Sequence, residues 1–241
     1  LVSVPRSGDL DLARAVVESL LARLAGGDPQ VLLDLREELS SADPDPAEIA
    51  ALVQQARQGQ GVWSFPVDEG LFARTRDLVA RVCPDEEDCF SVEDQVRLAE
   101  ADPGLFEEWI HAVQHARDEQ AIVTAHLDLL EGQIETIPEE LRRRTDAKIL
   151  ELEDLGFQVI RIPAYRVNLR KERAWPGISY VNALVVDEQV FVPRFGLGEV
   201  EDGVFRLVQA KLPPDYAIIP VDAQRVLIRN GGLHCLAGLI R

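Results

Sequence analysis

Hydrophobic positions recur every three or four residues along the first half of the chain. The spacing is clearest in four segments, 10–26, 47–58, 70–82 and 104–116. This periodicity is typical of amphipathic helices, and proline and glycine separate the segments from one another. Strand signals are nearly absent before about Gln120. We therefore expect residues 1–120 to form a mainly helical region, either an extra domain or an insertion.

The pattern changes after Gln120 to shorter segments in which strands and a helix alternate. The sequence "AIVTAHLDLL" (121–130) has strand character. It is followed by a helical segment, 137–156, with proline near its start and glycine at its end. The sequence "FQVIRIP" (157–163) then has the character of a second strand.

A similar series follows closer to the end of the chain. It consists of a hairpin of 179–186 and 189–195, a helix at 201–212 and a closing strand at 216–222. The plan is strand, strand, helix, strand, and the first series repeats it without a clear second strand. Because a ββαβ unit cannot bury both of its faces alone, the repetition favours an α/β propeller or another closed arrangement over residues 121–241.

Composition and charge exclude several classes of protein. The chain has 241 residues and 46% hydrophobic content, enough for a globular core. Its formal net charge of −17, without clustered Lys and Arg, argues against a nucleic-acid surface. No apolar run is long enough to span a bilayer, and the first residues lack the pattern of a signal peptide. We expect a cytoplasmic protein that binds neither nucleic acid nor membrane.

The cysteine and methionine counts add two expectations. Cys83, Cys89 and Cys235 are an odd number of cysteines in a chain without export features, which favours free thiols over a disulfide. The chain contains no methionine and begins with Leu1. These two features favour either a fragment or a sequence from which segments are left out.

A histidine and an aspartate stand two residues apart in "AHLDLL". If 121–130 is a strand, His126 and Asp128 point to the same face. An imidazole and a carboxylate on a buried face need partners, because an unpaired buried charge is costly. The other interpretation is that this face is exposed to water.

A second pattern closes the chain. In "RVLIRNGGLHC" (225–235) an apolar strand leads into two glycines, which allow backbone to come close to a ligand, and Cys235 follows. A lone cysteine is most often a small buried hydrophobic residue. Its thiol becomes a nucleophile where the surroundings favour the thiolate.

Taken in order, these motifs resemble a known family. The segments "SYVNALVVDEQVFVPRFG", "YAIIPVD" and "IRNGGLHC", with His-x-Asp upstream, are similar to the C-terminal part of the guanidino-group-modifying enzymes, the pentein superfamily. The agmatine deiminase and peptidylarginine deiminase branches are the most similar. The resemblance is good from Ser179 to Cys235 and thinner from Ala121 to Tyr165. It implies a pentein-type α/β propeller.

The resemblance also implies a reaction and roles for three residues. Cys235 matches the nucleophile that attacks the guanidinium carbon, and His126 matches the general acid and base. Asp128 matches a carboxylate that holds the guanidinium, which stays protonated at biological pH. The implied reaction converts the guanidino group of agmatine, arginine or peptidyl-arginine to a ureido group plus ammonia. It needs no metal and no organic cofactor.

Alternatives remain open at this point. An amidinotransferase would form the same covalent intermediate and pass it to an amine, and a non-catalytic binding module would keep only the fold. The family's additional carboxylate in the first half of the chain is unassigned here. The expected partner is a cationic guanidine-bearing small molecule or an arginine side chain, and homo-oligomers are left open.

Other polar residues give weaker indications. Asn182 in "YVNALVV" needs a hydrogen-bond partner if it is buried, and either structural bracing or substrate contact would supply one. Arg194 in "VPRFG" is most simply a surface cation at the end of a strand, although it could contact a substrate carboxylate. His111 and His115 have the spacing of a zinc helix but lack its glutamate, so we expect no metal site there.

Overall fold

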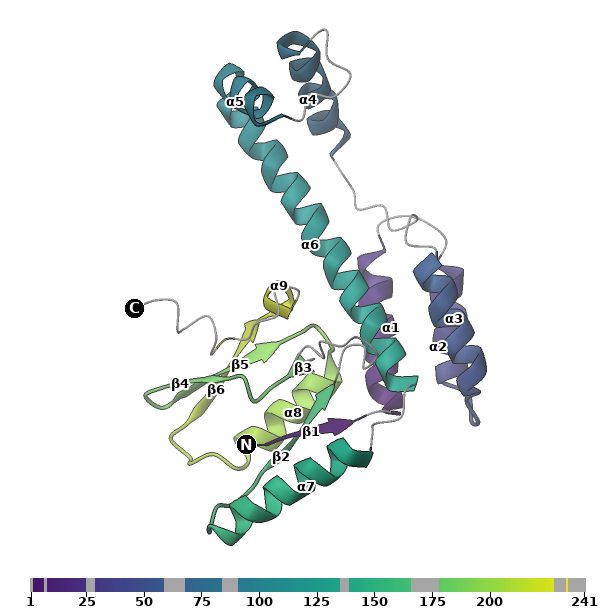
Figure 1. Ribbon diagram of the computed structural model, residues 1–241, viewed down its shortest axis with the longest axis vertical. Helices are drawn as coiled ribbons and strands as arrows, with labels where there is room; N and C mark the ends of the chain where they lie inside the picture. Colours follow the sequence, from purple (N-terminus) through teal and green to yellow (C-terminus); the bar gives the residue numbers. More distant parts are fainter. Residues whose placement is uncertain are drawn as a thin grey trace.

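The protein has a mixed α/β structure with one long helix running through it (Figure 1). The computed structural model describes residues 2–6, 8–24, 29–58, 68–83, 91–134, 139–165, 178–227 and 233. All statements below concern these residues.

Helices occupy most of the first half of the chain, as the periodicity predicts. They are α1 (Leu10–Arg23), α2 (Gln30–Leu39), α3 (Pro46–Gln58), α4 (Glu69–Val82), α5 (Val92–Ala101) and α6 (Pro103–Ile134). Side chains before several of them cap free backbone N–H groups; for example, Asp9 accepts a hydrogen bond from Leu12 N, and Asp68 accepts from Gly70 N and Leu71 N. The four segments with helical spacing are confirmed as helices.

The predicted strand at 121–130 is wrong, because these residues belong to α6. Nearly every side chain in this part of the helix is buried or half-buried, so apolar residues surround the helix axis. A short apolar run of this kind does not distinguish a buried helix from a buried strand. His126 and Asp128 therefore lie two residues apart on a helix, about 200° apart around its axis.

One sheet joins the two ends of the helical region. Its strand order is β1 (Val2–Arg6), β2 (Arg161–Tyr165) and β3 (Ile178–Ser179), with β1 parallel and β3 antiparallel to β2. The helix α7 (Glu139–Asp154), which the sequence predicts, precedes β2. The strand β1 was not expected in a helical region. Its five residues are too few for a clear alternation of polar and apolar positions.

The second sheet contains the predicted ββαβ unit. Its order is β4 (Leu184–Val186), β5 (Gln189–Arg194) and β6 (Ala217–Asp222), with α8 (Glu199–Gln209) between β5 and β6. The hairpin at Asp187 and Glu188 is confirmed, and Asp187 takes the positive φ of 51° that such a tight turn favours. β5 and β6 are parallel. Closure of such units into a propeller stays a prediction.

The last described helix corrects a further prediction. Residues Gln224–Leu227 form the short helix α9, where the sequence suggested an apolar strand. The segment of the Gly-Gly-x-His-Cys motif follows it, and Cys235 and His234 lie outside the described residues.

Buried hydrophobic residues form two separate clusters. The larger draws on α1, α2, α3, the second half of α6, both sheets and α8, so it includes residues from both sides of Gln120. The smaller consists of Leu71, Leu78, Cys83, Leu98 and Leu105, where α4 and α5 pack on the first half of α6 (Figure 1). The division into domains at residue 120 stays a prediction.

Cys83 corrects the expectation of free thiols, because it is disulfide-bonded. The other two cysteines of the chain, Cys89 and Cys235, both lie outside the described residues. No helix in the described part of the chain is long and apolar enough to cross a membrane. The cytoplasmic location stays a prediction.

Candidate active site

His126 lies on α6 and faces α1. Its side chain is 1% exposed, and Nδ1 lies 2.8 Å from the carbonyl oxygen of Ile122. Because a carbonyl can only accept, Nδ1 carries the proton in the neutral ring and Nε2 is an acceptor. Nε2 lies 3.4 Å from Ser19 Oγ, which can donate to it.

Burial lowers the pKa of His126 from 6.5 to about 4. The Ile122 carbonyl opposes this shift, the positive charge of Arg23 adds to it, and the negative charge of Glu119 opposes it. The imidazole is therefore neutral at pH 7, with Nε2 unprotonated and able to accept a hydrogen bond. A general base works best with a pKa near the operating pH, so His126 can act as one at pH 7 only where a bound substrate or a neighbouring charge raises its pKa.

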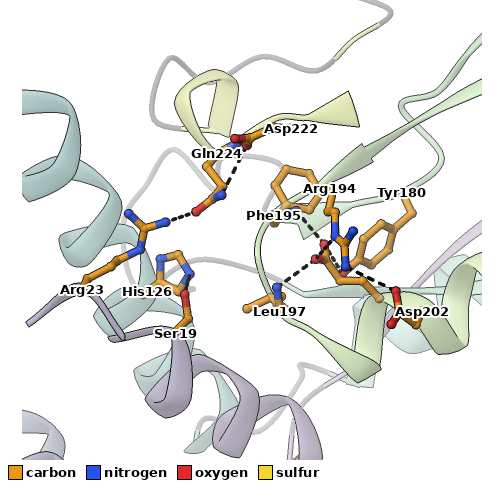
Figure 2. Close-up of polar contacts among 11 residues, drawn as sticks. Ser19, Arg23, His126, Tyr180, Arg194, Phe195, Leu197, Asp202, Asp222 and Gln224 are labelled. Atoms are coloured by element: carbon orange, nitrogen blue, oxygen red, sulfur yellow. Dashed lines mark hydrogen bonds and ion pairs between the residues drawn. The ribbon is translucent and has the colours of Figure 1, made fainter. Parts of the chain in front are cut away.

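Three polar side chains from three helices meet beside His126. The Arg23 guanidinium, at the end of α1, donates a hydrogen bond to Glu119 Oε2 on α6. It donates a second to Gln224 Oε1 on α9 (Figure 2). The Arg23 and Glu119 side chains are both 18% exposed. Glu119 lies seven residues before His126, two helical turns away on the same face of α6.

Gln224 connects this cluster to the loop that follows β5. Gly196 in "VPRFG" has a φ of 80°, and a Cβ atom built on it would lie 3.1 Å from Gln224 Cδ and Oε1. Glycine is thus needed both for the backbone conformation and for the approach of Gln224. Asp222, at the end of β6, accepts hydrogen bonds from the backbone and side-chain nitrogens of Gln224 at 3.0 and 3.3 Å.

Asp128 points to a different neighbour from His126. Its Oδ1 accepts a hydrogen bond from Arg57 Nη2 on α3 at 2.5 Å, and the same nitrogen donates to Glu131 Oε2 at 2.9 Å. The Asp128 side chain is 12% exposed. The structure does not place His126 and Asp128 on one face, because α6 is helical there. Asp128 does bind a guanidinium, but it is one from this chain.

A buried carboxylate holds the loop of the "VPRFG" motif. Glu201 on α8 is 0% exposed; its Oε1 accepts from Phe195 N at 2.6 Å and its Oε2 from Leu197 N at 2.8 Å. Tyr180 also donates its hydroxyl to Oε1, at 3.3 Å. Burial raises the pKa of Glu201, against the effect of the backbone N–H groups and of Arg194. The carboxylate therefore fixes the loop whose Gly196 contacts Gln224.

Arg194 and Asn182, the two weaker candidates from the sequence, both contact other groups of this chain. Arg194 is the last residue of β5, 45% exposed, with Nε 3.8 Å from Glu201 Oε2 and Nη2 3.4 Å from Asp202 Oδ1 (Figure 2). Asn182 lies after β3 and not within a strand, and its backbone N–H donates to Ser179 O at 3.4 Å. Arg194 thus lies in the loop network that Glu201 organises.

The family model of the Porphyromonas-type peptidyl-arginine deiminases matches residues 112–238, more than half of the chain. The matched region includes His126, Glu201 and Gln224, and it extends past Cys235. The chain belongs to this family. Membership bears out the resemblance on which the sequence interpretation depends.

Two curated relatives share the name "Putative agmatine deiminase". The one from Streptomyces coelicolor is 35% identical over 100 residues, which cover 41% of this chain and 27% of the relative. The one from Pectobacterium atrosepticum is 38% identical over 58 residues, 24% of this chain and 15% of the relative. The chain thus matches about a quarter or less of each relative's length.

One solved structure, the agmatine deiminase of C. jejuni, is 27% identical, with a TM-score of 0.32 over 41% of this chain and 31% of that one.

Within the described residues of this deiminase-family chain, no group of three or more His, Cys, Asp or Glu side chains could hold a metal ion.

Three residues near His126 were missed by the sequence interpretation: Ser19, Arg23 and Glu119. Ser19 and Arg23 are far from His126 in sequence, so no local pattern reveals them. Glu119 could have been found. If 104–130 is interpreted as one helix, the seven-residue spacing places Glu119 and His126 on the same face.

Proposed function

We propose that this member of the family is a deiminase-like hydrolase that converts a guanidino group to a ureido group plus ammonia. The substrate is agmatine, arginine or peptidyl-arginine. In this proposal the Cys235 thiolate attacks the guanidinium carbon, and ammonia leaves from the tetrahedral adduct. Water then attacks the amidino-thioether, which releases the ureido product and the thiol. His126 takes the proton of the Cys235 thiol at Nε2, gives it to the leaving ammonia, and later takes a proton from the attacking water and returns it to the departing Cys235 sulfur.

The observation that carries the proposal is the position of α9. Gln224, in its first turn, bonds to the arginine whose charge acts on His126, and α9 ends eight residues before Cys235. Eight residues span at most about 28 Å, a length compatible with the proposed contact between Cys235 and His126. The family match covers both residues.

A deiminase also needs a carboxylate to hold the substrate guanidinium. Two residues are candidates, one because of its sequence motif and the other because of its position. Asp128 has the position implied by the His-x-Asp motif, but it faces α3 and holds Arg57. Glu119 lies on the His126 side of α6 and holds Arg23. A substrate can bind either carboxylate only after the chain's own arginine gives way. We propose Asp128 as the clamp, with Glu119 as the competing assignment.

The first test is turnover. Intact protein is incubated with agmatine, arginine and an arginine-containing peptide, and ammonia and ureido product are quantified. We expect one substrate to be converted, Cys235→Ala to lower kcat by about 10³-fold or more, and His126→Gln to lower it by about 10²-fold. Absence of turnover by folded protein with all three substrates would contradict the proposal.

A second test asks whether Cys235 is a free thiol. Cys83 is disulfide-bonded, and the proposal requires a free Cys235. Thiol titration of the unreduced protein, with Cys235→Ala alongside, should count one reactive thiol in the parent protein and none in the variant. A Cys83–Cys235 bond, detected by peptide mapping, would rule out Cys235 as the resting nucleophile.

Substitution of the arginine that binds each carboxylate distinguishes the two candidate clamps. If Asp128 is the clamp, Arg57→Gln should lower KM, because the carboxylate no longer holds an internal guanidinium, while Asp128→Asn should raise KM by about tenfold or more. If Glu119 is the clamp, Arg23→Gln and Glu119→Gln should give these results instead. An equal response in both pairs would contradict a single clamp.

A second candidate function is a non-catalytic binding module. Its specific support is that both candidate carboxylates hold the chain's own arginines. A protein without turnover would bind agmatine in calorimetry and lose that binding in Asp128→Asn or Glu119→Gln. Amidinotransferase activity is checked in the same assay by adding an amine acceptor and quantifying the new guanidine.

A further inference from the structure

The smaller cluster of buried residues borders a cavity that the proposed reaction does not use. The cavity has a volume of about 620 Å³ and lies between α4, α5 and the first half of α6. These helices gather at the end of α6 that is distant from both sheets (Figure 1). The volume falls within the range of about 300–1,000 Å³ that is typical of small-molecule sites.

The lining of the cavity is mainly aromatic and aliphatic. Its hydrophobic members come from all three helices: Phe72, Leu78, Val79, Leu98, Phe106, Trp109, Ile110 and Val113. Phe72 is 52% exposed and Ile110 45% exposed, so large apolar side chains remain in contact with water here. Phe72 and Trp109 have ring centroids 6.3 Å apart. An apolar ligand body would remove this surface from water.

Two positively charged side chains, Arg76 and Arg117, also line the cavity. Within the described part of the chain, Arg117 has no ion-pair partner, and Arg76 has only Asp77 at 3.9 Å, with both of those side chains at least 70% exposed. Other arginines of this region hold acids more closely, as Arg74 holds Glu108 at 3.1 Å. In a chain with a net charge of −17, two weakly engaged cations beside one apolar cavity favour an anionic group.

A buried hydroxyl on the lining also lacks a partner. Thr75 is 9% exposed, and its Oγ1 makes no hydrogen bond within the described structure. Thr124 and Thr145, on other helices, donate their hydroxyls to the carbonyls four residues earlier, each at 2.9 Å. Thr75 lies between the apolar Leu71 and Leu78 on the inner face of α4. A polar atom of a bound ligand can form the hydrogen bond that the helix does not provide to this hydroxyl.

We propose that this cavity binds a small amphipathic anion. The apolar chain or ring of the ligand lies between the three helices, and its carboxylate, sulfonate or phosphate contacts Arg76 and Arg117. This site is separate from the region of His126, and its ligand is distinct from the cationic guanidine of the proposed reaction.

Isothermal titration calorimetry with three ten-carbon probes tests the proposal on the full chain. The probes are decanoate, decylamine and decan-1-ol, each below its aggregation concentration. The net charge attracts decylamine and repels decanoate, so non-specific binding would favour the amine. We expect decanoate to bind at least about tenfold more tightly than decylamine. Equal affinities, or tighter binding of the amine, would overturn the proposal.

Variants locate the site. The double change Arg76→Gln with Arg117→Gln should weaken decanoate by about tenfold or more and leave decan-1-ol unchanged. Arg74→Gln, on the same helix but outside the lining, is the matched control and should change neither affinity. If the double variant binds decanoate like the parent protein, the arginines do not form the anion site.

A filled cavity gives an independent check. Val113→Trp places a large ring in the cavity and should abolish binding of both decanoate and decan-1-ol, with circular dichroism confirming the fold. If this variant does not fold, Phe72→Glu, which adds a negative charge at an exposed lining position, should weaken decanoate by about tenfold or more. Undiminished binding in the folded variant contradicts the proposal. Sedimentation that shows a dimer, lost in the variant, would assign the surface to a second copy instead.

Discussion

The two halves of α6 have the same backbone conformation and very different surroundings. Between residues 120 and 133 the buried residues lie all around the helix axis and do not share one face. They are Ile122, Val123, His126, Leu127, Asp128, Leu129, Leu130, Gly132 and Gln133. Between 103 and 117, Leu105 is the one buried residue. The first half thus packs on one side against α4 and α5, while the second is enclosed by α1, α3 and α9.

This difference shows that helix formation and local stability are separate properties. Hydrogen bonds along the backbone are alike in both halves, so the tertiary packing decides how much free energy holds each half in place. We call the first half of α6, with α4 and α5, the outer half and the second half of α6 the inner half. We expect the outer half, with its small cluster, to unfold locally at a lower free-energy cost than the inner half. The following predictions, from the largest effect to the smallest, test that expectation.

Leucine truncations compare the two halves directly. Leu127→Ala, at 0% exposure in the larger cluster, should lower the free energy of unfolding by about 4 kcal/mol. Leu105→Ala, at 8% exposure in the smaller cluster, should lower it by about 2 kcal/mol. Urea unfolding measures both changes. Hydrogen exchange should show lost protection across the molecule for the first variant and only in α4, α5 and the start of α6 for the second; similar patterns would contradict the comparison.

The pH dependence of stability should come from the inner half. The folded-state pKa of His126 is about 4, below its ordinary value of 6.5. Between these values the unfolded chain binds the proton and the folded chain does not, so stability falls as pH drops from 6.5 to 4 and is unaffected by this group above 6.5. The loss amounts to roughly 3 kcal/mol.

His126→Gln should remove that part of the pH dependence. The matched control is His111→Gln, an exposed histidine in the outer half of the same helix, which should leave the slope between pH 6.5 and 4 unchanged. Urea midpoints at half-unit pH steps give the measurement. The same slope in the parent protein and in His126→Gln would show that another group causes it.

Ion pairs offer a third comparison. Arg57, Asp128 and Glu131 have side chains no more than 22% exposed, so Arg57→Gln leaves two partly buried carboxylates without their cation and should cost about 2 kcal/mol. Arg74 and Glu108 in the outer half are 55% and 49% exposed, and Arg74→Gln should cost less than about 1 kcal/mol. Chemical unfolding at low and high salt measures both. A larger loss at Arg74 would reverse the comparison.

The smallest effects concern two threonines. Thr75→Val removes a buried hydroxyl that has no partner within the described structure and should stabilise the protein by about 1 kcal/mol. Thr124→Val removes a hydroxyl that donates to Gln120 O and should change stability by no more than about 0.5 kcal/mol. Thermal unfolding of the ligand-free protein resolves the difference in sign. Destabilisation by Thr75→Val would indicate a bonded hydroxyl.

Much of the fold follows from local patterns in the sequence. The mainly helical character of the first half, α7 and the β4–β5 hairpin were predicted because their periodicity and turn residues act over a few positions. The strand β1 and the short helix α9 were not, because each contains few residues and is specified by what it packs against. The segment 121–130 was assigned wrongly because full burial removes the polar face that marks a helix.

The candidate site divides in the same way. The sequence identified His126, Asp128 and Cys235 by their order and by the family they resemble, and the family is confirmed. It placed His126 and Asp128 on the same face of a strand, and that geometry is wrong because the segment is helical. The catalytic roles stay predictions until turnover is measured, and Cys235 lies outside the described residues.

By itself, the sequence determined the family, the helical character of the first half and the ββαβ unit near the end. Those properties depend on side-chain spacing and on motifs that a chain carries in any conformation. Only the tertiary structure decided that His126 faces Ser19, Arg23 and Glu119 while Asp128 holds Arg57, and that an apolar cavity lies beside two arginines. Such contacts join residues that are distant along the chain, and each depends on how the helices pack on one another and not on any local pattern.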